Sequence, residues 1–553
     1  MSFSYAARVA VWIAAVVLAF QFPLLGAGFF RRVEKAGCTI AQRRWLCCFA
    51  LGLAVLLVRA ALLPVWGIPK PSIYDEFGYI LQSDTFSSGR LTNPPHPLGE
   101  FFESPYTLQR PTYNAKFPPG QGLMLATGQV LLGDPWFGVW LSCGILAMVL
   151  YWALGEWFPP GWALFGSVLM WPLLMTSYWM DSYWGGAVAA IGGVLVIGAV
   201  PGLKRRTFST AVVLATGSVI LMASRPFEGS VLLVPALCYL ILRKIPWKAW
   251  GLIVVLGAMG LALLGFYNYR VTGKPLRLPY VEYDSQYPST SHFNFLPLPP
   301  PAQFRHADFT AMDRWERAKW SRSRTLGFLS DRTSDVVKFL GILMGSALLI
   351  LPVGLFWPQL LRDKRLQLHR WCLGGLLLTL ATEVVYYPHY AAPFLAVIVV
   401  LVVQTYRHLR VWEYEGRPVG RALSRGLPLA ALLLWSGHEA VRIAQHQPIG
   451  DDPANTRHKA IEESLQERGG SHLILVRYTG DLDKLPAEWI YNRADIDNSP
   501  VIWAQDLGAV ENRKLLDHLK GRSVWLFEPE EDLTKLNPYN PPLETPGTEV
   551  SNR

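Results

Sequence analysis

The chain has 553 residues, of which 51% are hydrophobic and only 17% charged, whereas a soluble domain carries about 25% charged residues. This balance, together with repeated long apolar runs, excludes an ordinary soluble protein and indicates a protein that crosses the bilayer many times. The net charge of +10 does not imply nucleic-acid binding, because many basic residues fall in short loops between apolar runs.

The apolar runs predict an all-α polytopic membrane protein with about 12 transmembrane helices. They lie at about residues 10–29, 45–65, 136–155, 161–177, 184–201, 209–223, 229–243, 248–268, 337–357, 371–387, 391–406 and 427–443. Lys and Arg, which favour the cytoplasmic side, gather in short loops near residues 31–44, 204–206, 243–248, 362–370 and 407–425. These loops can share one side only if segment 120–133 does not cross the membrane.

Segment 120–133 has 14 residues, fewer than the ~20 that a span requires. Pro119 precedes it and Gly133 ends it, which is typical of a helix start and a helix end. We therefore predict a helix that lies on the outer surface. The loops 67–119 and 269–336 are placed on the same side.

The composition changes near residue 445, where the apolar runs shorten to strand length. Runs at 472–477, 488–491, 500–504 and 523–527 predict strands, and a polar helical pattern covers 511–519. The chain therefore divides into a transmembrane domain at residues 1–444 and a small C-terminal soluble α/β domain at residues 445–553. In this topology the soluble domain lies outside the cytoplasm.

Three acids at the outer ends of spans are candidate catalytic groups. Asp75 and Glu76 follow the second apolar run, and adjacent carboxylates raise one another's pKa, which suits a base near neutral pH. Asp181 lies between Trp179 and Tyr183, where a carboxylate could hold a sugar or a cation. For all three, capping a helix N-terminus is the competing interpretation.

Basic residues near the same ends are candidates for binding a phosphate: Lys116, Arg225, Arg59, Arg270 and His389. A charge inside an apolar run, such as Arg59, is a functional-site hypothesis, and snorkelling to the interface explains it equally well. A surface pair with Glu228 is the alternative for Arg225, and a structural role is the alternative for His389. The residues predicted to contact substrate are Tyr74, Tyr79, Tyr183, Glu228 and Tyr390.

The order of these motifs resembles that of the GT-C glycosyltransferases, in particular the protein O-mannosyltransferases and the bacterial lipid A aminoarabinose transferase. The residues that carry the resemblance are the stretch 74–79 with Asp75-Glu76, the stretch 114–120 with Lys116 before Pro118-Pro119, and Asp181. Gly78 stands where relatives often carry arginine, so that contacts to the donor would differ.

The resemblance implies a GT-C-like fold and an inverting transfer of a sugar from a polyprenyl-phosphate donor to an unknown acceptor (a lipid, a glycan or a protein). Asp75 would act at the acceptor, Lys116 would contact the phosphate, and Asp181 would shape the site or ligate a metal. No cofactor is certain, although a divalent metal is possible at Asp75 and Asp181. The implied location is the bacterial inner membrane, among membrane lipids, with the site on the periplasmic face.

A polytopic lipid or polysaccharide transporter or flippase is the alternative function. Transporters usually show paired halves and broken helices with polar groups at the bilayer midplane. In this chain no halves repeat, and most acids and aromatic residues lie at the ends of spans on one side. The sequence therefore favours the enzyme.

Overall fold

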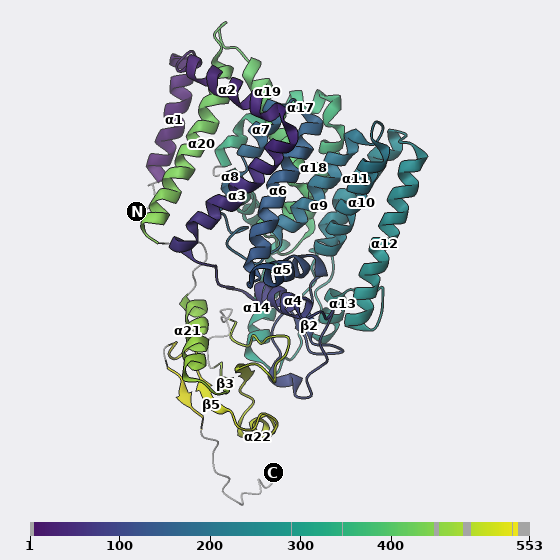
Figure 1. The fold of residues 1–553 in the computed structure, drawn as a ribbon, viewed down its shortest axis with the longest axis vertical. Helices are drawn as coiled ribbons and strands as arrows, with labels where there is room; N and C mark the ends of the chain where they lie inside the picture. The colour runs from purple at the N-terminus through teal and green to yellow at the C-terminus, as the bar shows by residue number, and fades with distance from the viewer. Residues whose placement is uncertain are drawn as a thin grey trace, which may run out of the picture.

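The computed structural model describes residues 5–288, 290–344, 347–446, 453–478, 488–533 and 535–539. A helical body is followed by a small sheet with flanking helices (Figure 1). The long body contains helices α1 (Tyr5–Gln21), α2 (Ala27–Gln42), α3 (Arg44–Trp66), α6 (Trp136–Trp157), α7 (Pro160–Val168), α8 (Trp171–Thr176), α9 (Gly186–Ala199), α10 (Thr207–Ser224), α11 (Pro226–Leu242), α12 (Trp247–Thr272), α15 (Gly327–Met344), α16 (Leu351–Leu355), α17 (Trp357–Arg362), α18 (Gln367–Thr382), α19 (Leu395–Val411) and α20 (Val419–Ala444).

Several of these helices are long and apolar enough to cross a membrane. Within the described residues they are α3, α6, α10, α12 and the segment Pro388–Val411, which joins the 3-10 helix η5 (Pro388–Phe394) to α19. A pair bent by 93°, Gly327–Leu343 with Leu348–Leu355, would make a sixth span. Five or six of the expected spans therefore meet this test, and other expected runs coincide with shorter apolar helices.

The first expected span, 10–29, is interrupted in the structure. Helix α1 ends at Gln21, and the amphipathic helix α2 begins at Ala27. Glu34 of α2 accepts hydrogen bonds from Arg410 at 2.9 and 2.8 Å and from Arg425 at 2.9 Å. These ion pairs join α2 to α19 and α20 at the top of Figure 1.

The opposite end of the body, here called the polar end, carries short elements in place of long helices. They are α4 (Tyr74–Ser87), α5 (Pro119–Leu132), α13 (Pro279–Gln286), α14 (Ala307–Ser323) and the antiparallel pair β1 (Thr107–Leu108) and β2 (Asn114–Ala115). Helix α5 begins at Pro119 and ends before Gly133, whose φ of 85° terminates it. The predicted short helix at 120–133 is therefore present.

Helix α4 packs closely against the residues that follow β2. Gln82 of α4 donates to the Phe117 carbonyl at 2.7 Å and to the Tyr267 hydroxyl at 2.9 Å. A Cβ added at Gly78 would lie 2.8 Å from the Phe117 ring, closer than real contacts allow. A side chain at this position, where relatives were expected to carry arginine, would therefore force the Phe117 ring to move.

The C-terminal region has a four-stranded sheet of order β4-β3-β5-β6. Strands β3 (His472–Val476), β4 (Val501–Gln505) and β5 (Ser523–Phe527) are parallel, and β6 (Asn537–Pro538) is antiparallel to β5. Helices α21 (Pro453–Arg468) and α22 (Ala509–His518) accompany the sheet. The strand predicted at 488–491 is wrong: these residues have no regular structure, and Glu488 turns back to accept a hydrogen bond from the Ile490 amide at 2.6 Å.

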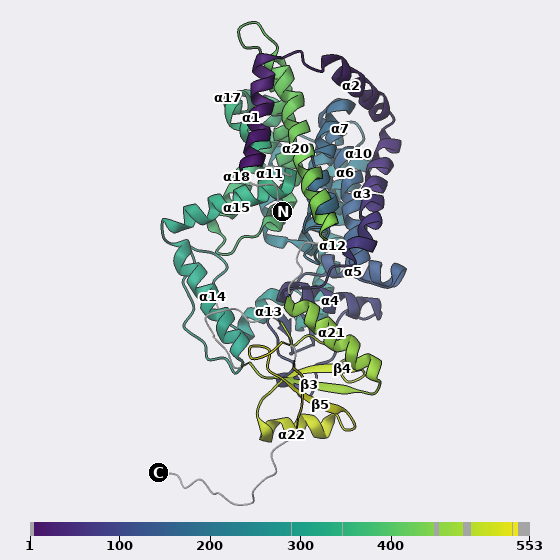
Figure 2. The ribbon, with the colours of Figure 1, turned by 90° about the vertical axis from the view of Figure 1, so that its left-hand side faces the viewer.

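This region docks on the polar end, where α13, α14 and α21 all lie near α4 (Figure 2). Asp84 of α4 accepts a hydrogen bond from the Ala494 amide at 2.9 Å. The Phe77 and Tyr491 rings are 4.8 Å apart between centroids. The C-terminal region therefore contacts the helix that begins with Asp75.

Candidate functional site

Asp75 lies in the first turn of α4 and is half-buried. Burial raises the pKa of its carboxyl group, and the positive charges of Lys116 and Arg225 oppose that rise. Within the described part of the chain, its carboxylate has no hydrogen bond to another side chain. Asp75 therefore faces two cations without being locked by either.

Lys116 follows β2 and is buried, with 7% of its surface exposed. Its ammonium lies 3.6 Å from the centroid of the Tyr106 ring and 4.8 Å from that of Tyr283, which are cation–π distances. Burial lowers the pKa of Lys116, and the negative charges of Asp284, Glu316 and Asp75 oppose the shift. The aromatic rings thus hold the ammonium in place.

Arg225 occupies the turn between α10 and α11. Its guanidinium lies 4.2 Å from the centroid of the Tyr390 ring and 3.7 Å from the Glu228 carboxylate. Burial raises the pKa of the Tyr79 hydroxyl to about 12. The negative charges of Asp75 and Glu228 add to this rise, and the positive charge of Arg225 opposes it. We call the group Asp75, Tyr79, Lys116, Arg225, Glu228 and Tyr390 the Asp75 cluster.

Glu76 points away from this cluster and anchors the start of α4. Its carboxylate accepts hydrogen bonds from the Ser72 amide at 2.6 Å, the Ser72 hydroxyl at 3.0 Å and the Tyr183 amide at 2.8 Å. The adjacent acids therefore divide their roles: Asp75 stays open, and Glu76 ties its helix to the turn before α9.

Asp181 lies in a separate, sealed site. It is 6% exposed and forms an ion pair of 3.0 Å with Arg59, whose guanidinium also lies 4.7 Å over the Trp136 ring. Arg442 of α20 packs 4.6 Å over Trp66 and donates to Glu439 at 2.7 Å. We call Arg59, Trp66, Trp136, Asp181 and Arg442 the Asp181 cluster.

Two of the other candidates border the Asp75 cluster: the His389 ring lies 4.9 Å from that of Tyr390, and Tyr74 lies beside the ring that holds Lys116. Tyr183 and Arg270 lie elsewhere. Tyr183 donates its hydroxyl to the Pro69 carbonyl at 3.0 Å. His389 is buried, with Nδ1 3.4 Å from the Tyr178 hydroxyl and its ring 4.5 Å from that of Trp184. Arg270 is exposed at the end of α12 and has no ion pair within the described chain. Tyr74 is buried, with its ring 6.3 Å from that of Tyr106.

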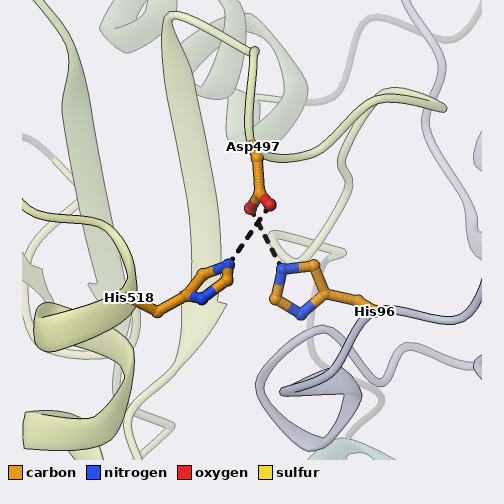
Figure 3. Close-up of side chains that lie close together, drawn as sticks. All are labelled: His96, Asp497 and His518. Atoms are coloured by element: carbon orange, nitrogen blue, oxygen red, sulfur yellow. Dashed lines mark hydrogen bonds and ion pairs between the residues drawn. The ribbon is translucent and has the colours of Figure 1, made fainter.

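Arg59 engages one oxygen of Asp181, and the other oxygen, which is also buried, has no hydrogen-bond partner in the described chain, so that a metal at Asp75 and Asp181 stays a prediction. Of the residues that the structure describes, only His96, Asp497 and His518 place three possible ligand atoms within 4.8 Å of one another (Figure 3). His96 Nε2 lies 3.0 Å and His518 Nε2 3.2 Å from the Asp497 carboxylate.

The hydrogen bonds of His96 do not suit a metal ligand. The Leu98 amide donates to His96 Nδ1 at 3.0 Å, so that the ring proton must sit on Nε2 and point at Asp497. A metal-bound histidine instead donates through its other ring nitrogen. The three side chains therefore connect loop 67–119 to the C-terminal region by hydrogen bonds.

The tyrosines of α13 were not among the residues predicted from the sequence. Tyr280 and Tyr283 both face Lys116, at 5.7 and 4.8 Å from its ammonium to their ring centroids. Their spacing of three residues, which places side chains on one helix face, was the available signal. Tyr106, the closest ring to Lys116, carried no comparable pattern.

No family profile matches this chain, and no curated protein matches it. Among solved structures it is similar to ArnT from Cupriavidus metallidurans bound to undecaprenyl phosphate, with a TM-score of 0.53 and 12% identity over 88% of this chain and 94% of that chain. Archaeal oligosaccharyltransferase AglB from Archaeoglobus fulgidus, in complex with an inhibitory peptide and a dolichol-phosphate, matches with a TM-score of 0.41 and 12% identity over 87% and 70%. Both are members of the GT-C superfamily. The resemblance to GT-C enzymes is thus confirmed as a likeness of fold, which the ArnT match alone carries.

Proposed function

We propose that this chain, which has a GT-C-like fold, is a membrane glycosyltransferase that moves a sugar from a polyprenyl-phosphate donor to an acceptor hydroxyl at the membrane–water interface. The observation that carries the proposal is the environment of Asp75, which is half-buried, acted on by the positive charges of Lys116 and Arg225, and free of a side-chain hydrogen bond in the described chain. A base must be open to its substrate, and a departing phosphate needs nearby cations. In a transporter the polar groups are instead expected near the bilayer midplane, between paired halves.

In this proposal Asp75 accepts the proton of the acceptor hydroxyl as its oxygen attacks the anomeric carbon. The bond from that carbon to the phosphate oxygen breaks, and its electron pair leaves with the polyprenyl phosphate. Lys116 and Arg225 stabilise the negative charge that develops there. The raised pKa of Asp75 favours this role, because a base acts best when its pKa approaches the working pH.

An apolar groove offers a place for the lipid chain of the donor. Tyr386 and Asp335 lie at one end, and leucines of α18 together with Phe339 and Ile398 form its walls. Tyr386 lies 5.6 Å from Tyr390 of the Asp75 cluster, measured between ring centroids. A polyprenyl chain in this groove would bring its phosphate toward Arg225.

The proposal includes about twelve spans, the polar end on the periplasmic face of a bacterial inner membrane, and a soluble C-terminal domain at 445–553. ArnT, to which the fold is similar, was solved with undecaprenyl phosphate. That supports the class of donor, and the acceptor is left open as a lipid, a glycan or a protein.

The test uses the purified full-length protein in vesicles with a panel of radiolabelled polyprenyl-phosphate sugars and acceptors of the three classes. We expect release of polyprenyl phosphate with at least one donor, and no release from the Asp75→Asn variant. Absence of release from every donor and acceptor pair, with folded protein, would contradict a glycosyltransferase. Equal release by wild type and Asp75→Asn would remove Asp75 as the base.

A further inference from the structure

A polar pocket lies beside the end of α12, away from the aromatic rings that hold Lys116. It has a volume of about 700 Å³ and is bounded by three prolines (Pro95, Pro97 and Pro111) and three cations (Arg110, Lys274 and Arg277). Helix α13 separates it from Lys116: Tyr280 and Tyr283 face the ammonium, whereas Glu282 and Gln286 line this pocket. We call it the basic cleft.

The charges in the basic cleft are not balanced. Its carboxylate, Glu282, lies 2.7 Å from Arg277 and neutralises that residue. The head groups of Arg110 and Lys274 have no hydrogen bond or ion pair to any residue that the structure describes, and both residues are exposed. The cleft therefore presents two uncompensated positive charges to a ligand.

The cleft lies next to the exposed apolar surface of α12. Only 17% of the most apolar stretch of α12 is buried in the protein, so that this helix presents its side chains to the bilayer. The chain leaves α12 at Gly273, and Leu276 in the following turn is 95% exposed. An apolar side chain this exposed, between Lys274 and Arg277, is typical of a segment at the membrane interface.

We propose that the basic cleft binds the anionic head group of a bilayer lipid, whose acyl chains lie along the exposed face of α12. Arg110 and Lys274 supply the charge for the phosphate. The apolar face of α12 distinguishes a lipid from a free anion, because a free anion gains nothing from it. This site is independent of the transfer reaction, since its ligand does not contact the Asp75 cluster.

The test measures lipid retention by the detergent-purified full chain with native mass spectrometry at fixed salt. Phosphatidylglycerol is the anionic probe, and phosphatidylcholine is the zwitterionic one. We expect a preference for phosphatidylglycerol that falls about fivefold for each cation removed in Arg110→Gln and Lys274→Gln, and further in the double variant. Thermal unfolding should be unchanged, because both side chains are exposed.

Arg270→Gln is the matched control. Arg270 is exposed in the last turn of α12, at the same interface, but it does not line the cleft. A specific site predicts that this variant retains the lipid as wild type does. If Arg270→Gln weakens retention as much as Lys274→Gln, the attraction is diffuse and the site is wrong. Lack of preference between the two lipids, or displacement of phosphatidylglycerol by millimolar inorganic phosphate, would also overturn it.

Discussion

Asp75 and Asp181 both lie near basic residues at the polar end, but only Asp181 is directly paired with one of them. Asp181 contacts Arg59 directly, and the Trp136 ring covers the guanidinium. Asp75 is influenced by Lys116 and Arg225 over a distance, while aromatic rings hold both cations. An acid paired with its cation stabilises the fold, whereas cations held apart from an acid leave room for a ligand.

Helix α4 keeps these two regions in a fixed relation. Glu76 is bonded to the Tyr183 amide, two residues beyond Asp181. The turn that carries Asp181 therefore positions helix α4, which carries Asp75. We expect substitutions in the Asp181 cluster to act on stability and those in the Asp75 cluster to act on turnover.

The largest expected effect is that of Asp75→Asn. Asparagine has nearly the same shape but cannot accept the proton, and loss of a general base costs roughly 10²–10⁴-fold in rate. The rate should be measured under donor saturation, with thermal unfolding as the control for folding. If the variant does not fold, Asp75 is a structural acid, as Asp181 is expected to be.

The next effect is that of Asp181→Asn, which leaves Arg59 buried without its counter-ion. Removing one partner of a buried pair costs about 3–5 kcal/mol of folding free energy. We expect a lower unfolding temperature, measured by size-exclusion chromatography of heated samples. Replacing both partners, in Arg59→Met with Asp181→Leu, should restore much of the stability.

The double variant also tests catalysis. If Asp181 is structural, the stable double variant retains activity, measured as release of polyprenyl phosphate. A stable but inactive double variant would show that Asp181 takes part in the reaction, as the family resemblance implied.

A smaller effect is expected for Lys116→Met. A hydrogen bond to a charged group contributes about 1.5–3 kcal/mol, so that kcat/KM for the donor should fall roughly 10–100-fold. The KM for the acceptor should not change, because Lys116 is assigned to the phosphate. Lys319→Met, an exposed lysine of α14, is the control, and an equal loss for donor and acceptor would contradict the assignment.

Local patterns in the sequence predicted the elements that depend on neighbouring residues. Helix α5 was placed from its length and its flanking Pro119 and Gly133, and three of the four predicted strands are present. Asp75 and Lys116 were placed on the same face because both belong to loop 67–119, and the family resemblance then gave them roles in one site. Such features leave a period or a boundary signal in the chain.

Contacts between distant segments leave no such signal. Arg59 and Asp181 are 122 residues apart, and the sequence offered each as a separate candidate. The anchoring role of Glu76 depends on Tyr183, more than a hundred residues away. Helix α2 was missed because its basic residues were assigned to a cytoplasmic loop at 31–44 and its first apolar residues to the span at 10–29.

Glu488 extends the comparison to a buried acid that no cation contacts within the described chain. Ser104 donates to its carboxylate at 2.7 Å, and the charge that acts on it, among the described residues, is that of Asp308 of α14, which is also buried. Burial, with the added repulsion from Asp308, raises the pKa of Glu488 to about 8. In Asp181, by contrast, the ion pair with Arg59 opposes the effect of burial.

The raised pKa predicts that docking of the C-terminal region weakens as the pH rises. The folded state holds its proton up to about pH 8, whereas an unfolded glutamate releases it near pH 4.5. Stability is therefore complete below pH 4.5 and declines between these values by about 1.4 kcal/mol per pH unit. Hydrogen exchange of β3 and β5 between pH 5 and 8, corrected for intrinsic rates, measures this decline.

Glu488→Gln should flatten that slope, because glutamine keeps the shape and does not ionise. Glu511→Gln on α22, where the carboxylate is paired with Lys514 at 2.8 Å, should leave the slope as it is in wild type. A slope that persists in Glu488→Gln would assign the titration to another group. If the stability of the wild type does not change with pH, the charged Glu488 carboxylate is stabilised by water or by another group. Burial alone would then not make Glu488 different from Asp181.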